Sequence, residues 1–232
     1  LKNLVESEED LLHVHWAFPM GFLSYLSGKI TKRKIIVTLH GLETTLAEKN
    51  ALFQKYLIKI IDNSVLTTVV AQHIVNDLKR FKINENKIVR LPIGINTEVF
   101  RRTKIDKIPK QFKDIIDGRI VVGSLGSLIS HKQIDLLIKS FSGLNSNNFV
   151  LLIGGDGPEK EKLIKLTNSL ELDNVKFLGK ISPANTALFL SLLDIFVLPS
   201  IYEAMGMVLV EAMACGKPLI GSKVGGIPEV IE

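Results

Sequence analysis

The sequence is poor in cysteine and in aromatic residues, and both shortages limit what the protein can be. Among 232 residues there is one cysteine, Cys215, and phenylalanine, tyrosine and tryptophan together make up 6%. A single cysteine excludes a disulfide within the chain and fits a reducing compartment such as the cytoplasm. Cys215 lies on the apolar side of a predicted helix, so we expect a buried thiol. So few aromatic residues argue against the stacking platforms that bind single-stranded nucleic acid, and no nucleic-acid partner is expected.

Long apolar runs and the common metal and hydrolase motifs are also missing. No run of about 18 apolar residues could span a membrane, and no secretory signal opens the chain, so we expect a cytoplasmic protein. The sequence contains no Asp-x-Asp, His-Glu-x-x-His or Gly-x-Ser-x-Gly. We therefore expect no metal-bound diphosphate, no metal and no cofactor.

The residues that are present suit a globular protein with an excess of basic side chains. Hydrophobic residues make up 46% and charged residues 23%, which is enough for a core, and the net charge is +5. Basic residues cluster at 29–34 and 101–110. Solvated lysines on loops and helix ends explain these clusters most simply. Attraction to anionic lipid headgroups at the inner membrane surface is the alternative, and it needs a basic face beside an apolar one.

Apolar, β-rich segments alternate with helical segments along the chain. Strands are expected at 11–15, 34–39, 66–71 and 87–91, and in a second series at 119–125, 148–153, 175–178, 194–198 and 218–221. Helices are expected at 20–29, 46–63, 72–81, 133–144, 158–170, 183–192 and 207–215. This alternation predicts an α/β fold with parallel sheets and helices on both faces. A polar, basic stretch separates the two series, so we expect domains at 1–100 and 119–232 with a linker at 101–118.

The strongest functional signal lies near the end of the sequence. A strand stops at Pro199, a turn carries Glu203 and Gly206, and a helix then runs to Gly216. A helix that begins at the carboxyl end of a parallel strand points its free N–H groups into the crevice where α/β proteins bind ligands, and those groups suit a phosphate. Glu203 and, eight residues later, Glu211 suit hydroxyl groups. Phosphate and hydroxyl groups together indicate a nucleotide sugar.

This order of strand end, glutamate, glycine turn and second glutamate resembles the group 1 glycosyltransferases, family four of the glycosyltransferases. The segments 13–15, 38–41 and 91–100 are also similar to that family, so the resemblance covers essentially the whole chain. It implies a GT-B type fold, with two Rossmann-like domains whose parallel sheets face a cleft. The family's opening strands and glycine-rich turn have no counterpart here, nor have its last strand and helices. The chain is therefore expected to be a fragment that lacks both ends, with an incomplete N-terminal domain.

The resemblance also implies where the donor binds, with two departures from the family pattern. Family members have Gly-Arg-Leu and then Lys-Gly after the first strand of the second domain, and the basic pair holds the donor diphosphate. Here Lys132 keeps the cation, while Ser127 replaces the arginine and Gln133 replaces the glycine. His131 either supplies part of the missing charge or is a solvated loop residue.

Further roles are implied at other positions that match the family. The resemblance places Glu211 on the ribose hydroxyls, where a carboxylate accepts two hydrogen bonds, and Glu203 beside the hydroxyls of the transferred sugar. It places His40 across the cleft, facing the donor sugar, so Glu203 and His40 are the candidate catalytic residues. Backbone groups complete the donor site: those around sugar and phosphate belong to Ala204, Met205, Gly206, Met207 and Val208, and those along the nucleobase to Ile181 and Ser182.

Two further motifs are interpreted as structural. The glycine-rich segment 154–158 lacks the spacing of a P-loop or of a dinucleotide fingerprint, so it predicts a tight turn after a strand. His13 and His15 are two residues apart on a predicted strand, so their side chains lie on the same face. A metal pair is one reading of them, but no further ligand cluster supports it, and strand-end histidines near the cleft are favoured.

The sequence thus predicts a retaining, metal-independent glycosyltransferase of the hexosyltransferase type. It would move a sugar from a nucleotide-sugar donor to a glycan, lipid or small-molecule acceptor. Two other classes stay open. A non-catalytic nucleotide-sugar-binding remnant, or a subunit that needs a partner, is favoured by Ser127 and by the missing glycine turn. A sugar-nucleotide epimerase of the same architecture is disfavoured by the pair Glu203 and Glu211.

Overall fold

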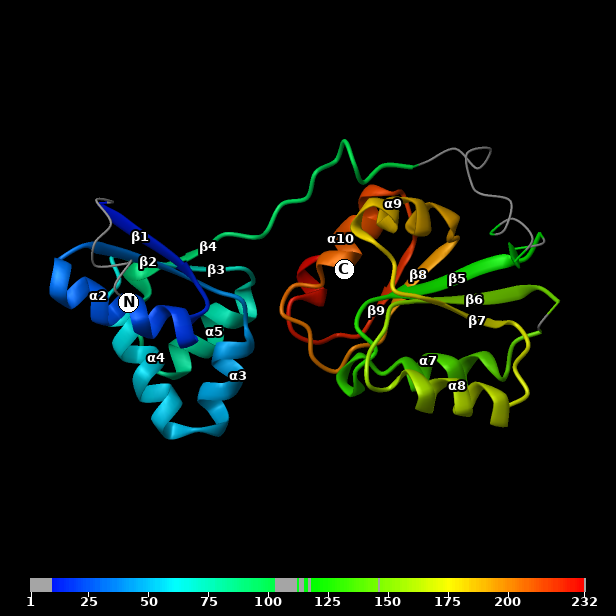
Figure 1. Cartoon of the computed structure of the whole chain (residues 1–232), viewed down its shortest axis with the longest axis horizontal. Helices are drawn as coiled ribbons and strands as arrows, with labels where there is room; N and C mark the ends of the chain where they lie inside the picture. The colour runs from blue at the N-terminus through cyan, green and yellow to red at the C-terminus, as the bar shows by residue number, and fades with distance from the viewer. Residues whose placement is uncertain (1–9, 103–111, 113–114, 117, 146, 232) are drawn as a thin grey trace. The chain divides into compact units, whose positions relative to one another are not determined.

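The computed structural model describes residues 10–102, 112, 115–116, 118–145 and 147–231, and the chain forms two compact units (Figure 1). The units are Leu1–Ile93 and Gly94–Glu232. The division falls before residue 100, the predicted end of the first domain, and Phe100 packs against the core of the second unit. Most of the predicted linker at 101–118 lies outside the described residues.

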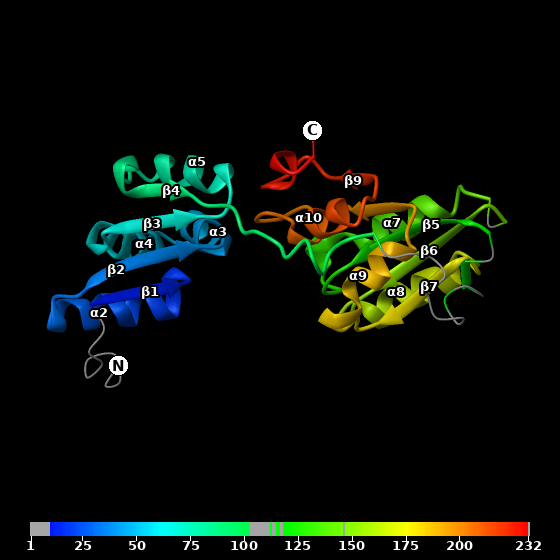
Figure 2. The ribbon, with the colours of Figure 1, turned by 90° about the horizontal axis from the view of Figure 1, so that it is seen from above.

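The first unit is built on a four-stranded parallel sheet, seen from above in Figure 2. Its strands, in their order across the sheet, are β1 (Leu11–His15), β2 (Lys34–Leu39), β3 (Leu66–Val69) and β4 (Ile88–Arg90). Its helices are η1 (Ala17–Gly21), α2 (Phe22–Thr31), α3 (Leu42–Lys49), α4 (Ala51–Asn63), α5 (Gln72–Arg80) and η2 (Glu85–Lys87). Alternation along β1 buries Leu12 and Val14 and leaves His13 and His15 exposed, as a period of two residues requires.

The prediction of one helix in this unit is wrong. The apolar pattern over 46–63 predicted a single helix, but the structure has α3 and α4, separated at Asn50. Asn50 is extended, with φ −143° and ψ 109°, and its side chain accepts the backbone N–H groups of Leu52 at 2.9 Å and Phe53 at 3.1 Å. An asparagine in this place satisfies amide groups that the new helix cannot satisfy itself. Local capping therefore divides a continuous apolar pattern.

The second unit is a five-stranded parallel sheet with helices on both faces. Its strands are β5 (Ile120–Leu125), β6 (Phe149–Gly154), β7 (Val175–Gly179), β8 (Ile195–Leu198) and β9 (Leu219–Gly221). Its helices are η4 (Ser130–Lys132), α7 (Ile134–Phe141), α8 (Lys160–Ser169), α9 (Pro183–Leu192), α10 (Met207–Ala214) and η5 (Ile227–Glu229). Helices α7 and α8 lie on one face of the sheet, and α9 and α10 on the other (Figure 1). Successive residues of β5 serve both faces: Val121 belongs to the core under α9 and α10, and Val122 to the core under α7 and α8.

The order of strands in the second sheet is β7-β6-β5-β8-β9. Strands β6 and β7 therefore lie on one side of β5, and β8 and β9 lie on the other. The loops that leave the carboxyl ends of β5 and β8 diverge at this switch point and form the usual ligand crevice of a doubly wound sheet. The predicted α/β fold with parallel sheets is confirmed. Cys215 is a buried free thiol, as predicted. Within the described part of the chain, no helix combines the length and the hydropathy that a membrane span needs.

Candidate functional site

A cavity of about 620 Å³ lies at the carboxyl edge of the second sheet. Its lining comes from the end of β5, from the segments that follow β5, β6 and β7, from the first turn of α9, from the first two turns of α10, and from Phe100. The volume falls within the roughly 300–1,000 Å³ of small-molecule sites. Four of the predicted donor-site residues line it, namely Ser127, Ile181, Val208 and Glu211. Other lining residues were not predicted, among them Phe100, Asp156, Pro183 and Thr186.

Glu211 is a half-buried carboxylate on the second turn of α10. Burial raises the pKa of its carboxyl group above the ordinary value. The described residues offer this carboxylate no hydrogen-bond or ion-pair partner. A carboxylate with a raised pKa, facing a cavity and lacking a partner among these residues, is a candidate ligand-binding group.

The first turn of α10 stands next to Glu211. Gly206, just before the helix, has φ 75°, a left-handed conformation that favours glycine. No described side chain caps this end of the helix. The backbone N–H groups of Met207 and Val208 are therefore left for solvent or for a ligand, and a phosphate is well suited to them.

Lys132 and Glu203 form an ion pair beside the cavity. Lys132 Nζ lies 2.5 Å from Glu203 Oε2, and the two side chains are only 17% and 16% exposed. They come from the loops after β5 and β8, the two strands at the switch point. We predicted Lys132 on a diphosphate and Glu203 on a sugar. The structure makes each the counter-ion of the other, and neither lines the cavity.

Two glycines support the loop that carries Glu203. The N–H of Gly226 donates to the Glu203 carbonyl at 3.1 Å. A Cβ atom on Gly225 would lie 1.8 Å from the same carbonyl oxygen, and one on Gly226 would lie 2.3 Å from the carbonyl oxygen of Ala204. Both contacts are with backbone, so the loop keeps its position only while these residues lack side chains.

A second close approach joins the loops after β5 and β6. Gly155 has φ 136°, and a Cβ atom on it would lie 1.8 Å from the carbonyl oxygen of Gly126. The segment 154–158 leaves β6 with Gly155 and Gly157 at positive φ, and the predicted tight turn stays a prediction. Gly155 also lines the cavity. Gln133, which stands where the family has glycine, has φ 51° and precedes α7. Its left-handed backbone is a physical reason for a glycine at that position.

The remaining residues predicted for the second unit do not line the cavity. The ring of His131 meets that of Tyr202 edge-on, with 6.1 Å between the ring centroids. Ser182 is the residue before α9. Ala204 and Met205 lie in the loop that packs on the two glycines.

In the first unit, His40 follows the last residue of β2 and belongs to a row of aromatic rings. Its Nε2 lies 3.0 Å from Nδ1 of His15, and its ring centroid lies 5.2 Å from that of His15 and 5.0 Å from that of Trp16. Burial lowers the pKa of His40, the charge of Glu43 opposes this shift, and His15 adds to it. The lowered pKa favours a neutral imidazole, which can donate one hydrogen bond and accept another.

The other histidine of β1 belongs to the same row. His13 Nε2 lies 2.8 Å from the hydroxyl of Thr38, and its ring stacks on that of His15 with 4.9 Å between centroids. No group of three or more His, Cys, Asp or Glu side chains in the described ranges is placed to hold a metal ion.

Glu43 anchors the backbone around this row, and we did not predict it. Its carboxylate is 2% exposed and accepts the N–H groups of Ala17 at 3.3 Å, His40 at 3.1 Å and Gly41 at 3.0 Å. Three such bonds compensate the burial of the carboxylate, and a position in the first turn of α3 adds the helix dipole. A glutamate just after a strand and inside a new helix is the sequence signal that could have identified it.

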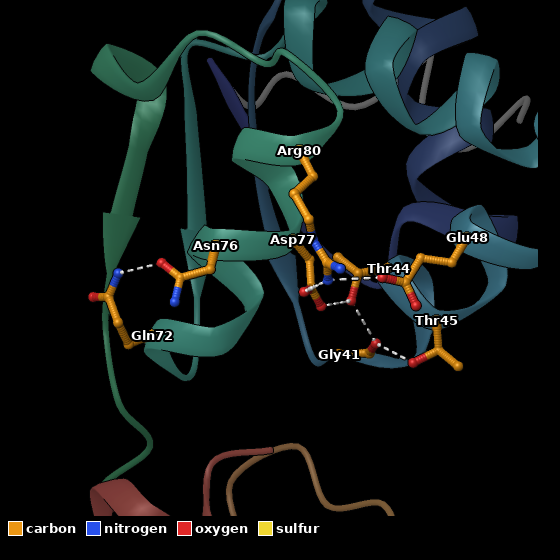
Figure 3. A network of polar contacts seen from close by, with 8 residues as sticks. All are labelled: Gly41, Thr44, Thr45, Glu48, Gln72, Asn76, Asp77 and Arg80. Atoms are coloured by element: carbon orange, nitrogen blue, oxygen red, sulfur yellow. Dashed lines mark hydrogen bonds and ion pairs between the residues drawn. The ribbon is translucent and has the colours of Figure 1, made fainter. Parts of the chain in front are cut away.

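A second polar network reaches the same loop from α5 (Figure 3). The Thr44 hydroxyl lies 3.0 Å from the carboxylate of Asp77 and 3.0 Å from the carbonyl oxygen of Gly41. Arg80 pairs with Asp77 and, at 2.7 Å, with Glu48. Helices α3 and α5 therefore both hold the loop that carries the candidate catalytic histidine.

Comparison with known sequences matches each half of the chain to a glycosyltransferase family. Residues 106–232 match the family described as glycosyl transferases group 1, and residues 2–99 match glycosyltransferase family 4. N-acetyl-alpha-D-glucosaminyl L-malate synthase of Bacillus anthracis is 31% identical over 228 residues, which are 96% of this chain and 59% of that protein. Alpha-monoglucosyldiacylglycerol synthase of Streptococcus pneumoniae is 28% identical over 226 residues, which are 91% of this chain and 51% of that protein. The chain spans less than two thirds of the length of these relatives.

Solved structures share the fold. The crystal structure of Anabaena Alr3699/HepE in complex with UDP and glucose matches with a TM-score of 0.87 at 21% identity, over 97% of this chain and 62% of that one. Sucrose-phosphate synthase from Thermosynechococcus elongatus matches with a TM-score of 0.78 at 22% identity, over 96% of this chain and 58% of that one. These likenesses establish two Rossmann-like units of the GT-B type.

Proposed function

The chain belongs to the group 1 glycosyltransferases, and from this premise we propose that it holds the nucleotide-sugar site of a glycosyltransferase. The observation that carries the proposal is Glu211, a carboxylate without a partner among the described residues, in a cavity at the switch point of the second sheet. The uncapped first turn of α10 lies beside it. A carboxylate binds vicinal hydroxyls and a helix N-terminus binds phosphate, and a nucleoside diphosphate presents both groups.

The proposed reaction transfers a hexosyl group to a hydroxyl of a glycan, lipid or small-molecule acceptor. The bond between the anomeric carbon and the diphosphate breaks, and the nucleoside diphosphate leaves with the electron pair. The acceptor oxygen forms the new bond on the same face, and its proton passes to the leaving phosphate. Configuration is thereby retained, and no metal is required. Negative charge grows on the leaving group, so cations and N–H dipoles beside it lower the barrier.

We assign the residues of the site to parts of the donor. Glu211 accepts hydrogen bonds from the ribose, and the loop at Ile181 and Ser182 follows the nucleobase. The backbone amides of residues 204–208 surround the phosphate and sugar. Glu203 is assigned to the transferred sugar, and a role of His40 in the reaction stays a prediction from the family pattern.

The ion pair of Lys132 and Glu203 sets a condition on donor binding. A diphosphate must compete with Glu203 for the ammonium of Lys132, since the two are already in contact. Ser127 brings no charge of its own. The hydroxyls of the donor sugar would then take Glu203 as their acceptor, so that the ion pair separates as the two halves of the donor bind.

Titration calorimetry tests the assignment of Glu211. The chain is titrated with UDP, GDP and ADP and with their glucose conjugates. Glu211→Gln should weaken the affinity for the preferred nucleotide about 10- to 100-fold, because a hydrogen bond to a charged group contributes about 1.5–3 kcal/mol. Glu161→Gln, at an exposed position of α8, is the matched control and should bind as the wild type does. Equal losses in both variants, or no binding of any nucleotide, would remove the proposal.

A binding module without turnover is the second candidate. Two observations favour it: Ser127 replaces a basic residue, and Lys132 is neutralised by Glu203. Both reduce the positive charge available to a leaving diphosphate. The two candidates differ in donor consumption. A nucleotide sugar that binds but is neither hydrolysed nor transferred, with glycan, lipid and small-molecule acceptors all supplied, would favour the module.

The acceptor class also bears on where the protein works. A lipid-borne acceptor would bring the chain to the inner membrane surface from the cytoplasm. The net charge of +5 would then favour contact with anionic headgroups.

A further inference from the structure

We propose that the first unit binds an unbranched alkyl chain of the acceptor in an apolar cavity between η1 and α4. The inference rests on the proposed function, because it names the acceptor class of the same reaction. The cavity measures about 200 Å³, and its lining includes Ala17, Phe18, Leu52, Phe53, Tyr56 and Ile60. It lies wholly within the first unit and shares no residue with the larger cavity of the second.

The lining of this cavity suits an uncharged, apolar ligand. No lining residue is charged, and the two polar side chains are Asn50 and Tyr56. The side-chain oxygen of Asn50 already accepts the N–H groups of Leu52 and Phe53. An ionised or hydroxylated group would lose its hydration there with little in return. A methylene group gains free energy by leaving water for such a site.

The size of the cavity suits one narrow arm of a larger molecule. Sites that enclose a whole ligand measure roughly 300–1,000 Å³, and this one is smaller. At roughly 30 Å³ for a group the size of a water molecule, the cavity has room for about seven such groups. An alkyl chain of about that length would fill it.

The mouth of the cavity exposes apolar side chains on two elements. Phe18 is 56% exposed, Leu52 61% and Tyr56 41%. The ring of Phe18 meets that of Phe53 edge-on, with 6.0 Å between centroids. Exposed apolar groups gathered around a hollow mark an interaction site. An alkyl chain that enters would remove both its own surface and this rim from water.

The lining of the cavity is linked to His40, the candidate catalytic residue of the first unit. Ala17, which lines the cavity, follows Trp16, and the Trp16 ring lies 5.0 Å from that of His40. The N–H groups of Ala17 and His40 donate to the same carboxylate, that of Glu43. An acceptor whose alkyl arm fills the cavity would therefore keep its polar end near His40. The occupant is an amphiphile with a hydroxylated head and an unbranched tail.

Intrinsic fluorescence is a suitable readout, because Trp16 is the only tryptophan of the chain and directly precedes Ala17 of the cavity lining. The chain is titrated with methyl, butyl, hexyl, octyl and decyl β-glucosides below their critical micelle concentrations. We expect the affinity to rise about fourfold for each methylene that enters the cavity, which corresponds to about 0.8 kcal/mol per methylene. The gain should stop once the chain exceeds what the cavity holds. Calorimetry repeats the titrations with a second readout.

Two leucines provide a matched pair of variants. Leu52 and Leu136 are both exposed, at 61% and 52%, and each lies in the first turn of a helix, where a carboxylate is well tolerated. Leu52→Glu places a charge at the mouth of the cavity and should weaken octyl glucoside binding at least tenfold. Leu136→Glu, in the second unit, should leave it within twofold. Leu52→Gln should give a smaller loss in the same direction, and circular dichroism should show all three variants folded.

Several outcomes would overturn the proposal. These are equal affinities for methyl and octyl glucoside, an affinity that keeps rising with chain length, binding only above the micelle concentration, and equal losses in Leu52→Glu and Leu136→Glu. None of these titrations involves a nucleotide. A chain that binds UDP but no alkyl glucoside would contradict this inference alone, whereas alkyl binding without nucleotide binding would contradict the proposed function alone.

Discussion

Gln133 holds a backbone conformation that is costly for any residue with a side chain. Its φ of 51° and ψ of 38° are left-handed, a conformation that costs about 1–2 kcal/mol for such a residue. A glycine at this position would relieve that cost, but it would also stabilise the unfolded chain by about 0.4–1 kcal/mol because glycine has more conformational freedom there. We expect Gln133→Gly to raise the free energy of unfolding by up to about 1 kcal/mol in urea denaturation, and Gln133→Ala to give no gain. A loss of stability in Gln133→Gly would mean that the hydrogen bond from the side-chain Nε2 of Gln133 to the Ser130 carbonyl, at 3.1 Å, outweighs the strain.

We expect Glu211 to lower the stability of the folded protein in the absence of a ligand. Burial raises its pKa, so the folded protein holds this proton more tightly than the unfolded chain does. The ionised group therefore costs stability at neutral pH, and the cost disappears as the pH falls through the raised pKa. Glu211→Gln without nucleotide should melt at a higher temperature than the wild type at pH 7–8, and the difference should vanish near the unfolded pKa of about 4.3. Glu161→Gln should show no such difference. A wild type that is the more stable at pH 7 would mean that the fold stabilises the carboxylate instead.

The loop between β8 and α10 depends on its two supporting glycines. In Gly226→Ala the new Cβ would start 2.3 Å from the carbonyl oxygen of Ala204, so the loop must move. We expect a loss of at least tenfold in nucleotide affinity by calorimetry, with the circular dichroism of the wild type. Gly143→Ala is the control, since a Cβ there meets nothing within 4 Å. If Gly226→Ala bound nucleotide as tightly as Gly143→Ala, the loop would have no part in the donor site.

The boundaries of the elements show how far local sequence signals reach. The predicted helix 183–192 coincides with α9, because Pro183 at its first position marks its start. The predicted helix 46–63 fails because Asn50 lies between two stretches that share one apolar pattern. Periodicity detects the apolar face of a helix but not a break within it. A single capping residue decides that break.

The site as a whole could be predicted only in part. Glu211 and Val208 were predicted as donor-binding residues because they belong to one continuous motif, and both line the cavity of the second unit. The ion pair of Lys132 and Glu203 joins residues 71 positions apart, and no local pattern encodes it. The apolar cavity of the first unit was also missed, since it depends on how η1 packs against α4. Motifs locate chemistry along the chain, whereas tertiary packing decides which groups meet.

The molecule has two units, each with its own sheet, so a ligand of one need not stabilise the other. A nucleotide at 100 times its dissociation constant should stabilise the unit that binds it by about 2.7 kcal/mol. We expect saturating UDP, if it is the preferred nucleotide, to slow amide hydrogen exchange in β5 to β9 and to leave β1 to β4 unchanged. Exchange by mass spectrometry, with and without nucleotide, measures both units at once. Equal protection of both would mean that they unfold together.

Glu43 gives two loops of the first unit a common anchor, and this has a thermodynamic consequence. Its carboxylate holds the N–H groups of both Ala17 and His40. A ligand that displaces Ala17 must therefore disturb the surroundings of the His40 imidazole. Coupling between two sites is reciprocal. If an alkyl ligand changes the proton affinity of His40 by some factor, protonation of His40 changes the affinity for that ligand by the same factor. The arrival of an acceptor would then be linked to the uptake or release of a proton.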